Sequence, residues 1–180
     1  MKKEILFFEE DPPKDKTAIH VWFGKTDLPH EEFLRELIGR YLGEVPKDLA
    51  TTPEGKLYLP NQSLHFNLSD SEGWLAVAFS WQEAIGIDIE SVYPINEMDQ
   101  VIVNCFSSRE QEYVQEKDCS VRFWEIWNRK EACCKALGIG LQDNMKEWDC
   151  FGEDWVSVKD TWVKSLSLQD AFSGAVAICK

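Results

Sequence analysis

Three short β-like runs in close succession constrain the fold of this chain more than any other feature of its sequence. They are LHFNLSDS at 64–71, WLAVAFS at 74–80 and AIGIDIE at 84–90, with brief turns at Glu72-Gly73 and Gln82-Glu83. Alternating or β-branched residues bounded by turn residues are typical of strands, and short connections favour antiparallel neighbours. We therefore expect an antiparallel meander in this segment.

Helical patterns flank the three runs. PHEEFLRELIGRYLGE at 29–44 begins with proline and places its apolar residues on one stripe. SVRFWEIWNRKEACCKALG at 120–138 is the strongest helical pattern, with a serine as candidate N-cap and a glycine as its stop. Residues 96–117 also favour helix, with Ser107 or Ser108 as the candidate N-cap.

Further strand-like runs lie near both ends, at 17–24 and in the tail as WVSV, TWVKSLSL and GAVAIC. The order of strand, helix, strands, helices and strands predicts an α+β fold. The order also contains a weak internal similarity, because each half has one helix that would pack on β-strands. The natural boundary falls near residues 90–95, so we take 1–92 as an N-terminal half and 93–180 as a C-terminal half of one compact unit.

Composition narrows the possible functions. Hydrophobic residues make up 44% of the 180 residues, which is typical of a folded globular protein. The net charge of -13 argues against general nucleic-acid binding and against attraction to an anionic membrane. No stretch reaches the roughly 18 apolar residues of a membrane span, and the N-terminus lacks the apolar segment of a secretory signal. We expect a cytoplasmic protein whose six cysteines are reduced thiols.

Asp88 and Glu90 lie two residues apart at the end of the third β-like run. On a strand they project to the same side, with their Cβ atoms about 7 Å apart. Two carboxylates at this spacing suit a hard cation, because Mg²⁺ is commonly held by one or two carboxylates together with phosphate oxygens. The alternative is a pair of solvated side chains at a strand end.

The helix at 120–138 carries an unusual stripe. Trp124, Trp127, Glu131 and Lys135 follow one another at helical spacing on one face. An ordinary Glu-Lys pair at the edge of the helix would account for the two charges but not for their alignment with the tryptophans. A third carboxylate and an ammonium beside Asp88 would suit a metal-bound pyrophosphate.

The two motifs together resemble a known family. GIDIE at 86–90 and FWEIWNRKEACCKALGIGL at 123–141 are similar to the two signature motifs of the 4'-phosphopantetheinyl transferases, G-[IV]-D-x-E and W-x-x-K-E-[AS]-x-x-K-x-x-G-x-G-[LI]. Upstream, GKLYLPNQSLHFNLSDS at 55–71 resembles a third region of that family. The resemblance is to the single-chain form, which implies two similar tandem α+β halves. Each half would carry a small antiparallel sheet on a long helix, with the active site at their junction.

The resemblance implies transfer of the phosphopantetheine arm of coenzyme A to a serine of an apo acyl or peptidyl carrier protein. Asp88, Glu90 and Glu131 would hold Mg²⁺ on the pyrophosphate. Lys135 would contact the α-phosphate and stabilise charge as the P–O bond breaks. Glu131, or a metal-bound water steered by Asp88, would take the proton from the carrier serine.

The resemblance also implies a coenzyme site, in which Lys56 and Ser69 would face the 3'-phosphate. Asp70 stands where the family usually has a phosphate-binding histidine, and Arg35 matches a basic position of the corresponding helix. Because Asp70 would repel a phosphate, a weak or inactive homologue that binds a carrier protein or a nucleotide is the alternative function.

The resemblance further implies an acidic partner, because carrier proteins are usually acidic. Arg122, Arg129 and Lys130, on or beside the signature helix, could supply a docking patch or be ordinary surface charge. We expect a monomer, since the single-chain form needs no partner to complete its site.

Overall fold

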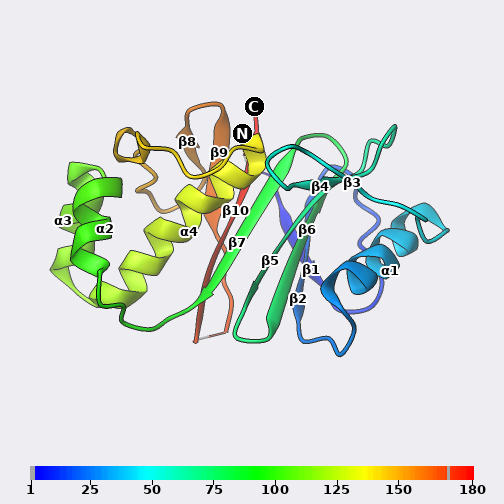
Figure 1. Ribbon diagram of the computed structural model, residues 1–180, viewed down its shortest axis with the longest axis horizontal. Helices are drawn as coiled ribbons and strands as arrows, with labels where there is room; N and C mark the ends of the chain where they lie inside the picture. Colours follow the sequence, from blue (N-terminus) through cyan, green and yellow to red (C-terminus); the bar gives the residue numbers. More distant parts are fainter. Residues whose placement is uncertain (1–2, 170) are drawn as a thin grey trace.

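Two small sheets pack against each other, and each carries a helix on its outer face (Figure 1). This arrangement is seen in a computed structural model, which describes residues 3–169 and 171–180. The layers therefore follow one another as helix, sheet, sheet and helix, a mixed α+β fold. Within the described ranges, no helix combines the length and apolar composition needed to cross a membrane.

The first sheet has the strand order β1-β2-β6-β5. β1 runs parallel to β2, and the other neighbours are antiparallel. Helix α1 covers its outer face, and glycine at position 43, in the left-handed region, ends this helix. The bounds are Ile5–Phe8 for β1, Ile19–Gly24 for β2, His30–Leu42 for α1, His65–Ser71 for β5 and Trp74–Ser80 for β6.

The second sheet has the order β7-β10-β9-β8, and all of its neighbours are antiparallel. Helix α4 packs on it through small residues such as Ala132 and Ala136. The bounds are Ile85–Ser91 for β7, Cys119–Leu137 for α4, Val156–Val158 for β8, Thr161–Ser165 for β9 and Phe172–Cys179 for β10.

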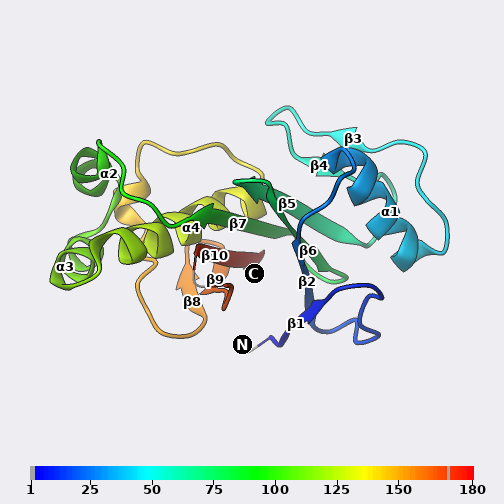
Figure 2. The same cartoon turned by 90° about the horizontal axis from the view of Figure 1, so that it is seen from below.

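Smaller elements surround these layers. Figure 2 shows α2 and α3 beyond the N-terminal end of α4, at the far side of the molecule from α1. Ser107 and Glu110 form a capping box at the start of α3, which satisfies backbone groups at that end of the helix. The bounds are Ala50–Thr51 for β3, Leu57–Tyr58 for β4, Met98–Cys105 for α2, Ser108–Glu116 for α3 and Met145–Glu147 for the 3₁₀ turn η1.

Alternation along β7 gives each of its faces a separate role. Ile85, Ile87 and Ile89 are fully buried in the cluster between the two sheets. The residues between them therefore face α4. At Gly86 the approach is so close that a Cβ atom would lie 2.2 Å from the carbonyl oxygen of Ala132. Any side chain here would displace α4, so this glycine sets how near the helix lies to the strand.

Much of the expected secondary structure is confirmed, including the α+β composition, α1, α4 and the antiparallel β5–β6 pair. The three-stranded meander is wrong in its last member, because β7 pairs with β10 and joins the second sheet. The predicted boundary at residues 92 and 93 thus separates β7 from its sheet. Asp118, rather than Ser120, is the N-cap of α4, and β1 was not predicted.

Candidate active site

A cavity of about 320 Å³ lies where β5, β7 and α4 meet. β7 supplies two acids and α4 supplies an acid, a base and an indole. The lining residues are Leu68, Ser69 and Asp70 from β5, Asp88 and Glu90 from β7, and Trp127, Glu131 and Lys135 from α4. The structure therefore brings together the two motifs that sequence analysis singled out.

Asp88 is the most deeply buried acid of this cavity. Its Oδ1 accepts hydrogen bonds from Ser69 Oγ at 3.0 Å and from Lys135 Nζ at 2.7 Å. Its Oδ2 is buried without a hydrogen-bond partner among the described residues. Burial raises the pKa of Asp88, and Lys135 and Ser69 oppose that rise. A buried carboxylate oxygen without a partner is costly, so this atom is suited to a ligand.

Glu90 and Glu131 complete the acidic side of the cavity. Ser71 Oγ donates to Glu90 Oε2 at 2.8 Å. Burial raises the pKa of Glu90, and the nearby charge of Asp88 raises it further. Burial, followed by repulsion from Asp88, raises the pKa of Glu131 to about 7. A carboxyl group with a pKa near neutrality can take up and release a proton under physiological conditions.

Lys135 is the cation of the cavity, and its side chain remains 30% exposed. Its ammonium donates to Asp88 and, at 3.2 Å, to Ser69 Oγ. An ammonium group has three hydrogens to donate. Within the described part of the chain Lys135 thus uses two of its donors, and the third is available to an anion in the cavity.

The donor set fits Mg²⁺ bound together with a phosphate compound. Among residues 3–169 and 171–180, no group of three or more His, Cys, Asp or Glu side chains is placed to hold a metal ion, the predicted set of Asp88, Glu90 and Glu131 included. Mg²⁺ does not need such a cage, because one or two carboxylates, substrate phosphates and waters usually complete its shell. The unpartnered Asp88 Oδ2 and the neighbouring Glu90 meet this requirement.

Comparison with known proteins assigns the chain to a family. A family model described as the 4'-phosphopantetheinyl transferase superfamily matches residues 84–174, about half of the chain. The chain belongs to this superfamily. The matched segment contains β7 and α4, and hence Asp88, Glu90, Glu131 and Lys135.

Individual members of the superfamily are similar over a longer stretch. The 4'-phosphopantetheinyl transferase gsp of Aneurinibacillus migulanus is 30% identical over 148 residues, which cover 75% of this chain and 60% of that protein. HetI of Nostoc sp., also a 4'-phosphopantetheinyl transferase, is 32% identical over 117 residues, covering 60% and 49%. The 4'-phosphopantetheinyl transferase Sfp of Bacillus subtilis strain 168 is 30% identical over 139 residues, which cover 72% of this chain and 61% of that protein. The chain thus spans about half to three-fifths of the length of these relatives.

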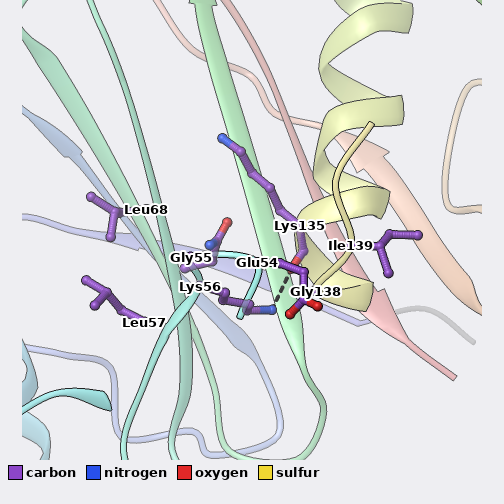
Figure 3. A pocket seen from close by; sticks show the side chains of 9 residues that line it. Glu54, Gly55, Lys56, Leu57, Leu68, Lys135, Gly138 and Ile139 are labelled. Atoms are coloured by element: carbon purple, nitrogen blue, oxygen red, sulfur yellow. Dashed lines mark hydrogen bonds between the residues drawn. The ribbon is translucent and has the colours of Figure 1, made fainter. Parts of the chain in front are cut away.

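A second cavity, of about 290 Å³, adjoins the first and shares Leu68 and Lys135 with it (Figure 3). Lys56 lies here, but its ammonium donates to three backbone carbonyls, those of Ile85 at 2.9 Å, Lys135 at 2.5 Å and Ala136 at 3.2 Å. Burial lowers the pKa of Lys56. In this superfamily member Lys56 therefore ties the end of α4 to β7, and this conformation leaves its ammonium no donor for a phosphate.

Of two other residues predicted to contact coenzyme A, Asp70 lines the main cavity and Arg35 does not. Asp70 lines the main cavity with a side chain that is 56% exposed, and His30 Nδ1 lies 3.7 Å from its carboxylate. Arg35 donates to the carbonyls of Pro46, at 3.0 Å, and Lys47. It is not among the residues that line the main cavity, because it instead fastens the loop that follows α1.

The predicted docking patch is wrong for two of its three residues. Arg129 is 2% exposed and donates to Glu125, Ser165 and the carbonyls of Cys150 and Gly152. Lys130 is completely buried. Neither can contact a partner without unfolding its surroundings, because every described contact of these side chains is internal. Arg122 is partly exposed and pairs with Glu116.

Ser71 is the site residue that sequence reasoning missed. It follows Ser69 at the two-residue period of a strand, just as Glu90 follows Asp88. That spacing was the available signal, because matching periods on two adjacent strands place Ser69 beside Asp88 and Ser71 beside Glu90.

Proposed function

We propose that this protein is a Mg²⁺-dependent 4'-phosphopantetheinyl transferase, a holo-acyl-carrier-protein synthase. It transfers the 4'-phosphopantetheine group of coenzyme A to a serine of an acyl or peptidyl carrier protein and releases 3',5'-ADP. The observation that carries the proposal is the single cavity that Asp88, Glu90, Glu131 and Lys135 share. Membership of the superfamily supports the same reaction.

The two helix-backed sheets fit a chain of two similar halves with a site at their junction. β5 is an edge strand of the first sheet and β7 an edge strand of the second, and both line the cavity. The protein would act as a monomer in the cytoplasm.

Asp88 and Glu90 would hold Mg²⁺ against the pyrophosphate of coenzyme A, and Glu131 would join them once the ion and the diphosphate are bound. When bound, the ion neutralises charge on the phosphates and strengthens the leaving group. Phosphoryl-type transfers depend mainly on positioning and on cations that neutralise developing charge. The acids would therefore contribute to the transfer through the cation that they hold.

Lys135 stabilises the leaving group. Its free donor faces the cavity, and it would contact the α-phosphate while the serine oxygen forms a bond to the phosphorus that carries the pantetheine arm. The P–O bond to the α-phosphate then breaks, and its electron pair stays with 3',5'-ADP. A lysine ammonium is a compact charge that suits this role.

Glu131 is the proposed base for the carrier serine. Its carboxylate lines the cavity and, in its ionised form, would accept the hydroxyl proton. Trp127 lies four residues earlier on α4 and lines the same cavity, so an apolar wall adjoins the base. This indole limits the approach of water to the base from that side.

The direct test is incubation of the protein with coenzyme A, Mg²⁺ and an apo acyl or peptidyl carrier protein, followed by intact mass measurement of the carrier. We expect a mass gain of one phosphopantetheine group that disappears when the Mg²⁺ is chelated. No gain on any of several acyl and peptidyl carriers would contradict the proposal.

A catalytically weak homologue that binds a carrier protein or nucleotide is the second candidate. The exposed carboxylate of Asp70 and the occupied donors of Lys56 favour it, because neither attracts a phosphate. Calorimetric titration with coenzyme A separates the two functions. The transferase requires Mg²⁺-dependent binding, whereas its absence would favour the second candidate.

A further inference from the structure

The face of the first sheet that points toward the second sheet is apolar on β6 but polar on the edge strand β5. On β6 this face carries Ala76 and Ala78, which are fully buried in the cluster between the sheets. Their partners on the neighbouring β5 are Ser69 and Asn67. The alternation continues to Ser71, so β5 presents a row of three polar side chains where an apolar row would be expected from its neighbour.

This polar row meets the backbone of β7. Asn67 Oδ1 accepts a hydrogen bond from the N–H of Ile87 at 2.9 Å. Ser69 Oγ accepts from Ile89 at 3.3 Å, and Ser71 Oγ accepts from Ser91 at 3.1 Å. The partners on β7 are again every second residue. β7 belongs to a different sheet from β5, so side chains here satisfy backbone groups that a neighbouring strand normally satisfies.

Both serines make a second contact of the same form. Ser69 donates to Asp88 Oδ1 at 3.0 Å, and Ser71 donates to Glu90 Oε2 at 2.8 Å. Each hydroxyl thus accepts from the backbone just after an acid and donates to that acid's carboxylate. A hydroxyl has one hydrogen to donate, and each of these serines donates it to that carboxylate. The repeated unit fixes both the strand and the orientation of each acid.

We propose that Asn67, Ser69 and Ser71, here called the side-chain ladder, position Asp88 and Glu90 to receive a divalent cation. Ser71 acts as a positioning residue through Glu90, and Asn67 sets the register of the two strands. The inference rests on the proposed function for the identity of the cation. It assigns the sequence pattern N-x-S-x-S on β5 a role that is separate from contact with coenzyme A.

The test compares Ser71→Ala with Ser71→Thr, which retains a hydroxyl and suits a strand. Mn²⁺, followed by electron paramagnetic resonance, probes the cation site without any transfer reaction. We expect Ser71→Ala to weaken Mn²⁺ binding about 10-fold, as loss of an outer partner of a ligand usually does. We also expect the Ser91 amide to exchange with deuterium about fivefold faster, with Ile87 unchanged. Ser71→Thr should restore both.

Ser80→Ala is the matched control. Ser80 Oγ also accepts from backbone N–H groups, those of Gln82 and Glu83, and donates to a carboxylate, that of Glu83. It lies at the other end of β6, outside the cavity. Equal loss of Mn²⁺ binding in Ser80→Ala, or unchanged Ser91 exchange in Ser71→Ala, would overturn the ladder. If the wild-type protein binds no Mn²⁺, the proposed metal site fails, and the amide exchange decides whether the ladder holds β7.

Discussion

Two lysines of α4, five residues apart, each pair with an acid but in contrasting surroundings. The Lys130 and Glu110 side chains are both 0% exposed, and their Nζ and Oε2 atoms lie 2.8 Å apart. Lys130 also donates to the carbonyls of Met145 and Trp148, so all three of its donors are used. Glu110 accepts from two backbone N–H groups as well, those of Ser107 and Cys150.

The Lys135–Asp88 pair is almost as short, at 2.7 Å, but it is incomplete. Lys135 is partly exposed and retains a donor, and one oxygen of Asp88 is buried without a described partner. The difference teaches how to tell a fully satisfied, structural pair (Lys130–Glu110, here called the closed pair) from one that is open to a ligand (Lys135–Asp88, the open pair) on the same helix. A buried charge pair whose hydrogen bonds are all satisfied joins α3, α4 and η1, whereas the unsatisfied pair faces a cavity that can complete it.

The largest expected effect comes from breaking the closed pair. Lys130→Met leaves Glu110 as an unpaired buried charge, so we expect the free energy of unfolding to fall by about 3–5 kcal/mol. Lys135→Met should lower it by about half of that or less, because water can reach the partly exposed pair. Urea denaturation of both variants measures the contrast.

The double variant Lys130→Met/Glu110→Gln checks the cause of the larger effect. It removes the buried charge on both sides, and glutamine retains the capping-box geometry at the start of α3. We expect it to recover part of the lost stability. Equal losses for the two single variants would show that the pairs do not differ in the way their hydrogen bonds suggest.

The cavity at the Lys135–Asp88 pair should matter most for the proposed transfer reaction. A substitution of Glu131, which lines the same cavity, tests this. We expect Glu131→Gln to slow phosphopantetheine transfer by about 100-fold or more, because the amide cannot accept the serine proton and, without a negative charge, is a weaker ligand for the cation. Single-turnover mass measurements of the carrier give the rate. Glu112→Gln, an exposed change on α3 with the same loss of charge, should leave it unchanged. A full rate in Glu131→Gln would remove this residue from both proposed roles.

The pKa of Glu131 predicts a smaller effect on stability. It is raised from 4.5 to about 7 in the folded protein, so the folded state binds this proton more tightly than the unfolded chain does. The stabilisation is complete below about pH 4.5 and is lost as the pH rises through about 7. With chelator present, Glu131→Gln should therefore become more stable than the wild type toward pH 8, by about 1–2 kcal/mol after allowance for solvent screening.

Urea titrations at pH 5 and pH 8 measure this gain. The control Glu112→Gln should show no comparable dependence on pH. A stability difference between Glu131→Gln and the wild type that does not change between these two values would contradict the raised pKa.

The sequence predicted well the local structure and which side chains share a face, because both depend on short periods. Helical spacing placed Glu131 and Lys135 on one face of α4, and strand spacing placed Asp88 and Glu90 on one face of β7. It did not reveal that β7 pairs with β10, whose residues lie some eighty positions further along the chain. Such pairing depends on how complete sheets pack, and a local run of isoleucines does not specify its partner.

The same limit explains the misplaced docking patch. Arg129 and Lys130 are charged residues on a helix, and charge usually indicates a solvent-exposed face. Their burial depends on acids and carbonyls contributed by distant segments, Glu110 and the loop at 145–152 among them. No periodicity along α4 identifies those partners. The motif lysine at 130 therefore resembles a surface charge in the sequence and is a core residue in the structure.

The smallest expected effect concerns Asp70, the exposed acid of the cavity between β5, β7 and α4. Its described ionic partner is His30, at 3.7 Å, so its carboxylate adds negative charge where a phosphate compound would bind. Two charges about 4 Å apart in water interact by about 1 kcal/mol. Asp70→Asn should therefore tighten coenzyme A binding by about threefold to fivefold in calorimetric titrations.

Glu72→Gln, which removes the same charge from an exposed residue in the adjoining turn, should have less effect. If both variants tighten binding equally, general charge rather than the position of Asp70 sets the affinity. If neither does, a phosphate does not lie beside Asp70, and the acid that replaces the usual histidine is compatible with a fully active site.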